Sequence, residues 1–548
     1  MAFFCENCGT KLPADAAFCE NCGAAVARDE QIENTEPAVT CTNKVDVNLF
    51  ADKGWAKSWE KLLLEKGGCE VGIILTNTSG CPDGLKGAYL EAVKKYSEAR
   101  RDEGVIYCCL DLGCQTVKSA FFGKSQVTLD FALSVLKKVY EVGMPDHLMI
   151  VGDREAVPSA KWENGLYDGG RGDSDKYVDS DVPYITLEAK SLFEGAPFSP
   201  KVGVGRIPSS AKGGFQEALT YFENAENLSM RAKKINAITL SAYEWKKVSQ
   251  MNFDDIDPDF YTCPSSSFVE RSELDIIDKR RPYNLLSFNL HGSDRHDYWV
   301  SGDGNAAYSP DCLPTSANVG YVIGTESCYG AKPVIRDSGE AQSTLVSALG
   351  DKCLAFFGST QIAYGIPDTA LAGGSKPCCA DILVGEFVNR VSDGWEFGKA
   401  YLSGLSALIS SVSGRCTAED VKTMCSFALY GDPSLTLTAP VGSKKTAKSA
   451  PAAKSETKSL HITMPDVRAI VGKKIAAVSK EIEDRLKAYV SRVYEGFEGV
   501  TPTYYKIGNK GEYKASYFSE ARSEDQISTI MNLYFDEDGT VGNVYVSK

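Results

Sequence analysis

The chain has 548 residues, a net charge of −14 and the apolar and charged fractions of an ordinary globular protein. This length exceeds a usual single domain, so we expect two to four folded units. The negative charge disfavours nucleic acids and anionic membranes as partners of the whole chain. No apolar run is long enough to span a bilayer, and we expect no secretory signal at the N-terminus.

The chain contains eighteen cysteines but only four histidines. In a small secreted protein so many cysteines would suggest disulfide bonds. In a long chain without a secretory signal they favour a cytoplasmic protein, in which reduced thiols bind metal or take part in catalysis.

Residues 1–26 are predicted to form a zinc ribbon. Cys5 and Cys8 form one Cys-x-x-Cys pair, and Cys19 and Cys22 form a second pair ten residues later. Four thiolates at this spacing suit the tetrahedral coordination of Zn²⁺. The repeated Phe-Cys-Glu-Asn-Cys-Gly resembles the short zinc-ribbon module at the start of many bacterial proteins. Because all four ligands are protein groups, the zinc is expected to be structural; a redox-active dithiol and a fortuitous set of cysteines are the alternatives.

Two linkers divide the rest of the chain. Residues 27–44 are polar and acidic, and residues 439–460 are rich in Ala, Ser, Lys, Thr and Pro. The first segment shows no periodicity, and the composition of the second is that of a flexible linker. The folded units predicted on either side of the second linker are residues 45–438 and residues 461–548.

Residues 45–438 are predicted to form a doubly wound α/β region with a mostly parallel sheet, as one body or as two subdomains. Apolar strand candidates alternate with helical patterns at the spacing of such folds. The predicted strands are residues 71–75, 105–110, 147–151, 201–207, 235–240, 285–290, 321–325 and 353–357. The predicted helices are residues 85–100, 129–142, 215–228, 342–349, 380–411 and 418–430.

The loop at residues 168–181 holds five carboxylates and three glycines. Clustered oxygens of this kind bind Ca²⁺, so calcium is a second candidate cofactor. The spacing matches no known calcium loop, and a solvated acidic loop is the alternative. Because Val182-Pro183-Tyr184 follows directly, the loop is also a candidate wall of a substrate cleft.

Two short motifs follow neighbouring predicted strands. Leu290-His291-Gly292 ends the strand at 285–290, and Glu326-Ser327-Cys328-Tyr329-Gly330 follows the strand at 321–325. Sites in open α/β sheets gather beyond the carboxyl ends of the strands, where these residues can form a thiolate–imidazole pair. A glycine after the histidine lets a backbone N–H approach a developing oxyanion. A helix following the second motif would lower the pKa of the thiol.

Each residue alone has a plainer interpretation. A cysteine outside the zinc ribbon is most often a buried apolar residue, and a lone histidine is mostly structural. His296 is a rival base, but it lies in a polar loop rather than at a strand end. Glu326 is interpreted as a structural or cleft-lining residue, because a carboxylate so close in sequence would raise the thiol pKa. The joint context favours His291 with Cys328.

This arrangement resembles the caspase–hemoglobinase fold, and residues 45–438 are similar to gingipain-type cysteine peptidases. The further stretches that carry the resemblance are residues 147–153, 202–208, 355–360, 363–365 and 429–435. The resemblance implies that Cys328 is the nucleophile and His291 the base or acid. It also implies that the N–H groups of Gly292 and Cys328 are the oxyanion donors.

The chain departs from these relatives in three respects. The relatives place a glutamate before the Val-x-x-Gly-Arg strand to orient the histidine, whereas residues 198–202 contain no carboxylate here. We therefore expect a dyad, or an orienting group elsewhere. Residues 207–215 contain no Asp or Glu that would hold a basic side chain, so cleavage after arginine is not secured. Third, the secreted relatives carry signal peptides, whereas none is expected here.

Residues 461–548 are predicted to form a small α+β domain. Apolar residues recur every three to four positions between residues 475 and 493, which indicates an amphipathic helix. Strands are predicted at residues 513–518, 529–535 and 541–546, and the turn before the last of them is a hairpin signal. No residue of this domain is expected to carry chemistry.

These features together predict a cytoplasmic cysteine endopeptidase of caspase-like fold that acts on a protein or peptide substrate. The zinc ribbon and the C-terminal domain are expected to be protein-interaction modules, and neither a nucleic acid nor a membrane is expected as a partner. The alternative class is a non-catalytic interaction protein with the same fold. A cysteine acyltransferase or ligase is a third class.

Overall fold

The structure is a computed structural model. It describes residues 3–4, 11–12, 46–121, 126–169, 172–209, 215–226, 231–254, 256–263, 283–314, 319–333, 343–412, 416–438, 462–494, 496–508, 511–520 and 527–548. The chain divides into two compact units. The small unit is Met1–Ala38 with Val441–Lys444, and the large unit is Val39–Pro440 with Lys445–Lys548.

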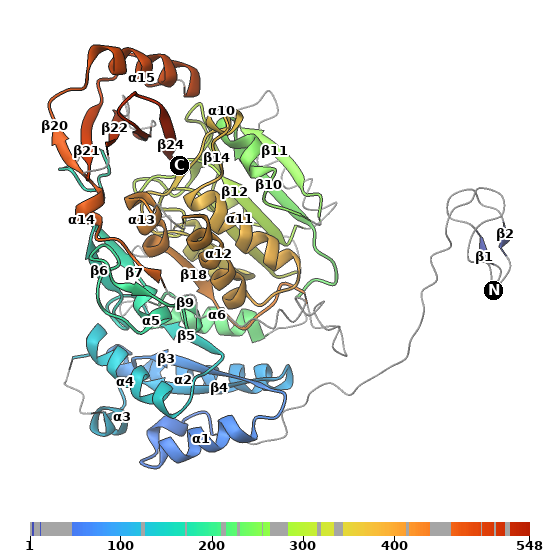
Figure 1. The fold of residues 1–548 in the computed structure, drawn as a ribbon. Coiled ribbons are helices and arrows are strands. Elements are labelled where there is room, and N and C mark those ends of the chain that lie inside the picture. The colour runs from blue at the N-terminus through green and yellow to red at the C-terminus, as the bar shows by residue number, and fades with distance from the viewer. Residues whose placement is uncertain are drawn as a thin grey trace. The chain divides into compact units, whose positions relative to one another are not determined.

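A ten-stranded sheet forms the centre of the large unit (Figure 1). The strand order is β11-β10-β12-β15-β16-β18-β9-β5-β3-β4. In chain order the strands are β3 (Glu70–Thr76), β4 (Val105–Asp111), β5 (His147–Val151), β9 (Gly203–Ile207), β10 (Ala237–Ala242), β11 (Asp259–Cys263), β12 (Leu285–Asn289), β15 (Tyr321–Thr325), β16 (Cys353–Ser359) and β18 (Phe427–Gly431). The eight strands predicted from the sequence are all present, and the large, mostly parallel α/β sheet is confirmed.

One strand, β18, joins the two halves of this sheet. It runs antiparallel to β16 and parallel to β9, while the other neighbouring pairs in the sheet are parallel. The predicted helix at residues 418–430 is therefore wrong in its last residues. Helix α13 (Ala418–Ser426) ends one residue before β18 begins. Phe427, Leu429 and Tyr430 are fully or nearly buried, which suits a central strand as well as a helix.

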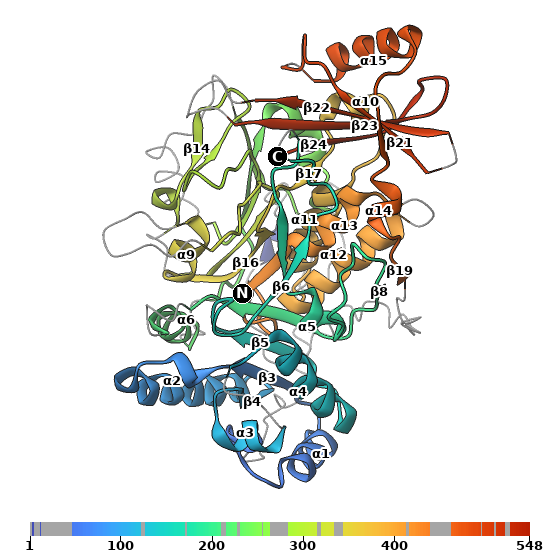
Figure 2. The same ribbon diagram turned by 90° about the vertical axis from the view of Figure 1, so that its left-hand side faces the viewer.

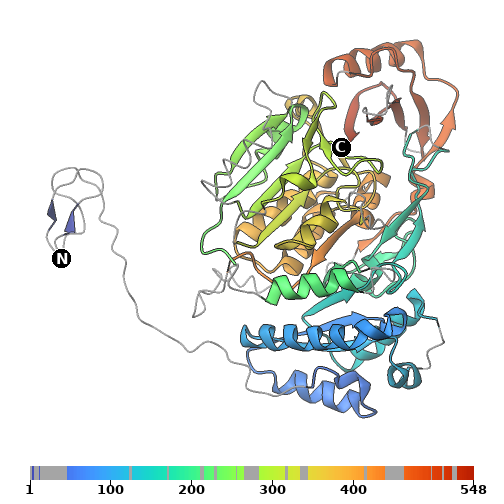
Figure 3. The same cartoon turned by 180° about the vertical axis from the view of Figure 1, so that it is seen from behind.

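Helices cover both faces of the sheet, because strand residues alternate between two buried faces. In β3, Val71, Ile73 and Leu75 belong to one core and Ile74 belongs to the other. The first core also contains α1 (Trp55–Glu65), α4 (Leu129–Val142), α11 (Cys379–Ser392), α12 (Phe397–Ser411) and α13. The second contains α2 (Asp83–Asp102), α6 (Gln216–Glu226) and α9 (Thr344–Leu349), of which α2 and α6 are seen from behind in Figure 3.

The C-terminal residues form a second, antiparallel sheet. Its order is β17-β24-β23-β22-β21-β20, in which β17 (Tyr364–Gly365) comes from the α/β region (Figure 2). The other strands are β20 (Lys473–Ile475), β21 (Thr503–Ile507), β22 (Glu512–Ser519), β23 (Thr529–Phe535) and β24 (Val541–Ser547). Helix α15 (Lys480–Val493) packs its apolar side on this sheet. The predicted helix and strands are present, but they belong to the same compact unit as the α/β region.

Two further observations concern membrane spans and cysteine pairing. Within the described residues, no helix combines the length and the apolar character that crossing a bilayer requires. Cys69 is disulfide-bonded, whereas twelve other described cysteines are free thiols. The bond at Cys69 does not follow from the expectation of reduced cysteines, so the cytoplasmic location stays a prediction.

Candidate functional site

Four strand ends meet at one edge of the large sheet. β10, β12, β15 and β16 are adjacent and parallel, so their carboxyl ends lie side by side. The residues that follow them are Glu244 and Trp245, then His291 and Gly292, then Glu326 and Cys328, and then residues 361–363. The structure thus brings together the histidine and cysteine motifs predicted from the sequence.

His291 is buried and held in one orientation. Its backbone exchanges two hydrogen bonds of 2.9 Å with Val300. Its Nε2 lies 2.8 Å from Glu244 Oε1, and its ring packs on Trp245 with centroids 4.4 Å apart. Nδ1 is buried and has no hydrogen-bond partner among the described residues. A carboxylate on one ring nitrogen leaves the other available for proton transfer, the arrangement of an oriented acid/base.

Glu244 lies in the position of an orienting carboxylate, the group that the sequence left unassigned. It follows β10 in the short helix η4 (Tyr243–Trp245), and Tyr494 donates a 3.3 Å hydrogen bond to Oε1. Burial raises the pKa of this carboxyl, but the hydrogen bond and the charge of His291 together lower it by more. The net pKa therefore lies below its ordinary value. The structure thus places a carboxylate on the histidine of the predicted Cys–His dyad. A signal existed, because Glu244 closely follows a predicted strand.

Cys328 lies in a tight, buried turn. Its Sγ accepts a 3.2 Å hydrogen bond from Ala363 N and lies 3.5 Å from Ala363 O. Burial raises the pKa of the thiol to about 12, and the N–H of Ala363 and the charge of Lys422 offset this only in part. The helix predicted to lower this pKa does not begin within residues 327–333. Tyr329 has φ 55°, a left-handed conformation that costs a non-glycine residue about 1 kcal/mol or more.

The two predicted oxyanion donors point at one oxygen. Cys328 N lies 3.0 Å and Gly292 N lies 3.5 Å from the carbonyl oxygen of Lys548, the last residue of the sequence. Gly292 is in direct contact with the cysteine, because a Cβ at this position would lie 1.9 Å from Cys328 O. Only glycine permits this approach. His296, the rival base, stacks on Tyr298 in the loop after His291.

The side chain of Lys548 fills a polar pocket beside these donors. Its Nζ donates to Asn289 Oδ1 at 2.9 Å, to Asp381 Oδ1 at 2.6 Å and to Glu326 Oε2. It also lies 5.0 Å from the ring centroid of Trp245. The ammonium is fully buried, and the two carboxylates hold its pKa above the ordinary value despite the opposing effect of burial. The expectation that residues 461–548 carry no chemistry stays a prediction, although Lys548 reaches the candidate site.

The acidic loop at residues 168–181 binds a lysine. Lys422 Nζ, which is fully buried, forms ion pairs with Asp173 and, at 2.7 Å, with Asp175. Asp175 also accepts hydrogen bonds from Tyr329 Oη at 2.7 Å and from Ile362 N at 2.8 Å. The loop thus supports both segments that contact Cys328. No finding supports the prediction that this loop binds calcium. Two of the five carboxylates of the loop are neutralised by the Lys422 ammonium.

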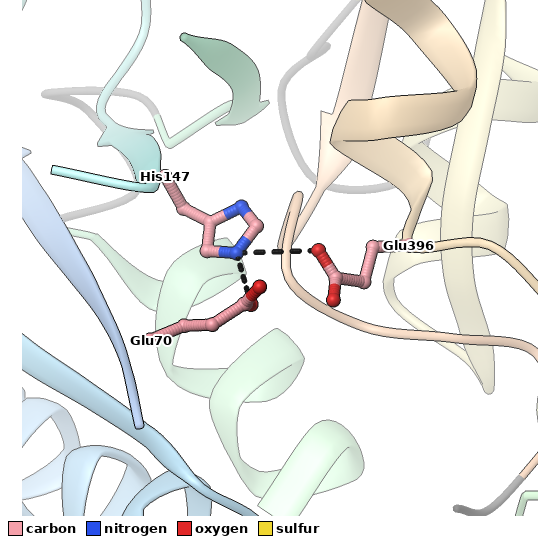
Figure 4. A group of neighbouring side chains, drawn as sticks. All are labelled: Glu70, His147 and Glu396. Carbon is pink, nitrogen blue, oxygen red and sulfur yellow. Dashed lines mark hydrogen bonds and ion pairs between the residues drawn. The ribbon is translucent and has the colours of Figure 1, made fainter. Parts of the chain in front are cut away.

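A second cluster of ionisable groups lies at the amino end of β5 (Figure 4). His147 Nε2 is shared between Glu70 Oε2 at 2.7 Å and Glu396 Oε2 at 3.3 Å. Lys399 Nζ lies 2.6 Å from Glu70 and 2.9 Å from Glu396. Since the lysine already supplies a cation to both carboxylates, this cluster is best understood as a structural tie between β3, β5 and α12.

We expect Glu70→Gln to lower the free energy of unfolding by about 1–3 kcal/mol, because it removes a charge that two partners share. The hydrogen bond and charge of His147, together with Lys399, hold the pKa of Glu70 below its ordinary value against the effect of burial. This contribution is present above the unfolded pKa of about 4.3 and is lost as the pH falls. Denaturant unfolding at pH 7 and pH 4 measures it, with the exposed Glu91→Gln as control.

The small unit contains an antiparallel pair, β1 (Phe3–Phe4) with β2 (Lys11–Leu12). Cys5 and Cys8 lie between these strands in the sequence, but the four predicted zinc ligands lie outside the described residues. A zinc-ribbon domain model matches residues 4–26. The chain therefore carries a zinc-ribbon domain at its N-terminus, which supports the predicted structural zinc. Among curated proteins, no sequence matches this chain.

The zinc ribbon predicts a metal content of about one zinc ion per chain, because four thiolates complete a closed structural site. We expect Cys19→Ser to lose most of this zinc after dialysis against a chelator, since three remaining ligands bind the ion more weakly. Elemental analysis of the purified protein measures the ratio. Cys114→Ser, which removes a free thiol elsewhere, is the matched control and should retain the metal.

Proposed function

We propose that the α/β region is a cysteine endopeptidase of caspase-like fold. Cys328 is the nucleophile, His291 the general base and acid, and Glu244 the carboxylate that orients His291. The N–H groups of Cys328 and Gly292 stabilise the oxyanion. One observation carries the proposal: both N–H groups donate to a single main-chain carbonyl oxygen beside the cysteine. The resemblance of residues 45–438 to gingipain-type peptidases supports the same assignment.

The reaction follows from these positions. As Sγ attacks the acyl carbon, the imidazole takes the thiol proton, which suits a thiol whose burial raises its pKa. Glu244 stabilises the imidazolium, and the two N–H groups stabilise the negative oxygen. The C–N bond then breaks as the imidazolium protonates the leaving amine. Water, deprotonated by His291, hydrolyses the thioester and restores the free cysteine.

The other parts of the chain fit a tethered peptidase. In the zinc ribbon, four protein thiolates leave no position on the ion for a substrate, so its role is to dock the enzyme on a protein partner. The substrate is a protein or peptide in the cytoplasm, where the metal site and most thiols remain reduced. A non-catalytic interaction protein or an acyltransferase would use the same fold differently, and the following experiment separates these classes.

The test is covalent labelling of the purified full chain with peptidyl acyloxymethyl ketones. We expect alkylation at Cys328, located by peptide mass spectrometry, and hydrolysis of peptide amides that Cys328→Ala abolishes. Alkylation without any hydrolysis, but with acyl transfer to an added amine, assigns the transferase. If Cys328 is never alkylated, even when residues 545–548 are deleted, the catalytic assignment is wrong. Cys81→Ala, which removes another buried free thiol, is the control.

A further inference from the structure

Strand β20 is an open edge of the C-terminal sheet. It is the last strand in the sheet order, and among the described strands its only neighbour is β21 (Figure 1). The backbone groups of Lys473, Lys474 and Ile475 make no hydrogen bond to a described residue outside β21. An edge of this kind can accept an extended segment of another protein as an additional strand.

Lysines gather at this edge without anionic partners. Lys473 and Lys474 on β20 and Lys506 on β21 are exposed, and none of the three forms an ion pair with a described residue. The neighbouring helix α15 differs, because its exposed Lys480 and Lys487 each form an ion pair with a carboxylate of the same helix. The edge at β20 is therefore a place where the positive charge of this domain is left uncompensated.

Two of these lysines face each other directly. Lys473 and Lys506 are cross-strand partners, so their side chains lie on the same face of the sheet, where like charges are destabilising. Lys474 lies on the other face, opposite Tyr505, whose ring centroid is 4.9 Å from the Nζ atom of the buried Lys514. Positive charge is thus concentrated on both faces at this edge, and an anion placed there relieves the repulsion.

The charges of the edge also disfavour one of its potential occupants. Lysines on an edge strand repel a second copy of the same strand, which is how many proteins prevent edge-to-edge aggregation. The same charges attract an acidic segment, so one feature both rejects self-pairing and selects a partner. Although the whole chain carries a net charge of −14, charges more than about 8 Å away are largely screened at physiological ionic strength, so the nearby lysines dominate.

We propose that β20 binds an extended acidic segment of a partner protein, which adds to the C-terminal sheet as its new edge strand. The main chain of this segment pairs with β20, and its side chains alternate between the two faces. Carboxylates lie opposite Lys473 and Lys474. An apolar side chain lies opposite Ile475, which packs against the second core. The proposal does not depend on the peptidase assignment, because no residue of the candidate site takes part in it.

The test is the binding of an acidic peptide to the purified full chain, measured by fluorescence anisotropy. The probe is a fluorescein-labelled peptide with the central sequence Thr-Glu-Glu-Ile-Thr, whose mass is checked after each measurement. We expect saturable binding that weakens as the salt concentration rises. The matched peptide with glutamine in place of both glutamates should bind at least roughly tenfold more weakly.

Reversing the charge of the edge identifies the residues that bind the peptide. We expect Lys473→Glu with Lys474→Glu to weaken binding at least roughly tenfold, because like charges then oppose each other. This double variant should instead bind the peptide with lysine in place of both glutamates, a gain that no folding defect would produce. Lys57→Glu with Lys137→Glu makes the same change of net charge at exposed positions of α1 and α4 and should leave binding unchanged.

Hydrogen exchange distinguishes strand addition from loose attraction between charges. The open amide groups of β20 should exchange more slowly when the peptide is bound, because they then donate to its carbonyl groups. A peptide with proline in place of the isoleucine lacks one main-chain donor and should bind more weakly than a peptide with valine there.

The proposal is overturned by equal binding of the glutamate and glutamine peptides, by binding that the charge reversal leaves intact, or by unchanged exchange at β20. Two further results would replace the acidic segment by another occupant. Self-association of the full chain that the charge reversal abolishes would assign the edge to a second copy. Tighter binding of a single-stranded oligonucleotide than of the acidic peptide, lost in the same variant, would assign the edge to a nucleic acid.

Discussion

Replacing Glu244 by glutamine should lower kcat/KM about 10³- to 10⁴-fold, because the amide favours the wrong histidine tautomer and leaves the imidazolium unsupported. Glu244 Oε1 lies 2.8 Å from His291 Nε2, and the pair is largely buried. The substitution keeps the size of the side chain, so the fold should be preserved. Steady-state kinetics with a peptide amide give kcat and KM separately, and the rate of Cys328 alkylation measures the reactivity of the thiol.

The control distinguishes positioning from a general loss of structure. Glu244→Asp keeps the charge on a shorter side chain and should recover part of the activity. The melting temperature of Glu244→Gln should stay close to that of the unmodified protein, while the rate of Cys328 alkylation falls, because the imidazole is no longer oriented by a carboxylate. Unchanged kcat/KM in Glu244→Gln would remove this residue from the mechanism.

Much of this site could be predicted because its parts follow strands. Buried apolar runs identify the strands locally, and the carboxyl ends of parallel strands meet at one edge. This reasoning placed His291, Gly292 and Cys328 together. Applied to the strand at 235–240, it would also have identified Glu244, because that strand lies beside β12. The resemblance to gingipain-type peptidases instead predicted the orienting carboxylate before the Val-x-x-Gly-Arg strand.

The pocket around the Lys548 side chain could not be predicted from the positions of strands. Lys548 is separated from Glu326 by 222 residues and from Asp381 by 167 residues. Periodicity and turn signals identified β24 as a strand, but they describe local structure only. Nothing in the strand pattern says which sheet edge it extends. Asp381 also occupies the first turn of α11, where a carboxylate is expected for capping alone.

The partner of the acidic loop at residues 168–181 could not be predicted either, because it is also distant in the sequence. Its carboxylates suggested either calcium or solvent, and both interpretations assumed that a charged loop needs a small cation or water. The cation is Lys422, 249 residues away from Asp173 in the chain. A buried lysine in α13 gives no sequence signal, because lysine is common in helices.

We expect Lys422→Met to lower the free energy of unfolding by about 3–5 kcal/mol at neutral pH, because it leaves two buried carboxylates without their partner. Lys422, Asp173 and Asp175 are all nearly inaccessible to solvent. Since Asp175 also binds Tyr329 Oη and Ile362 N, the rate of Cys328 alkylation should fall as well. Chemical denaturation and alkylation kinetics measure the two effects, with the exposed Lys176→Met as control.

The pH dependence of the stability of Lys422→Met identifies why this variant is less stable. Burial raises the pKa of Asp173, and the charge of Lys422 opposes that rise in the unmodified protein. Without the ammonium, the folded-state pKa of Asp173 should rise further above its unfolded value of about 3.9. A raised carboxyl pKa favours the folded state only at low pH, so the instability of Lys422→Met should grow from pH 4 to pH 7. Adding Asp173→Asn should recover part of the stability at pH 7. A deficit that is equal at both pH values would instead assign the loss to packing around the lysine chain.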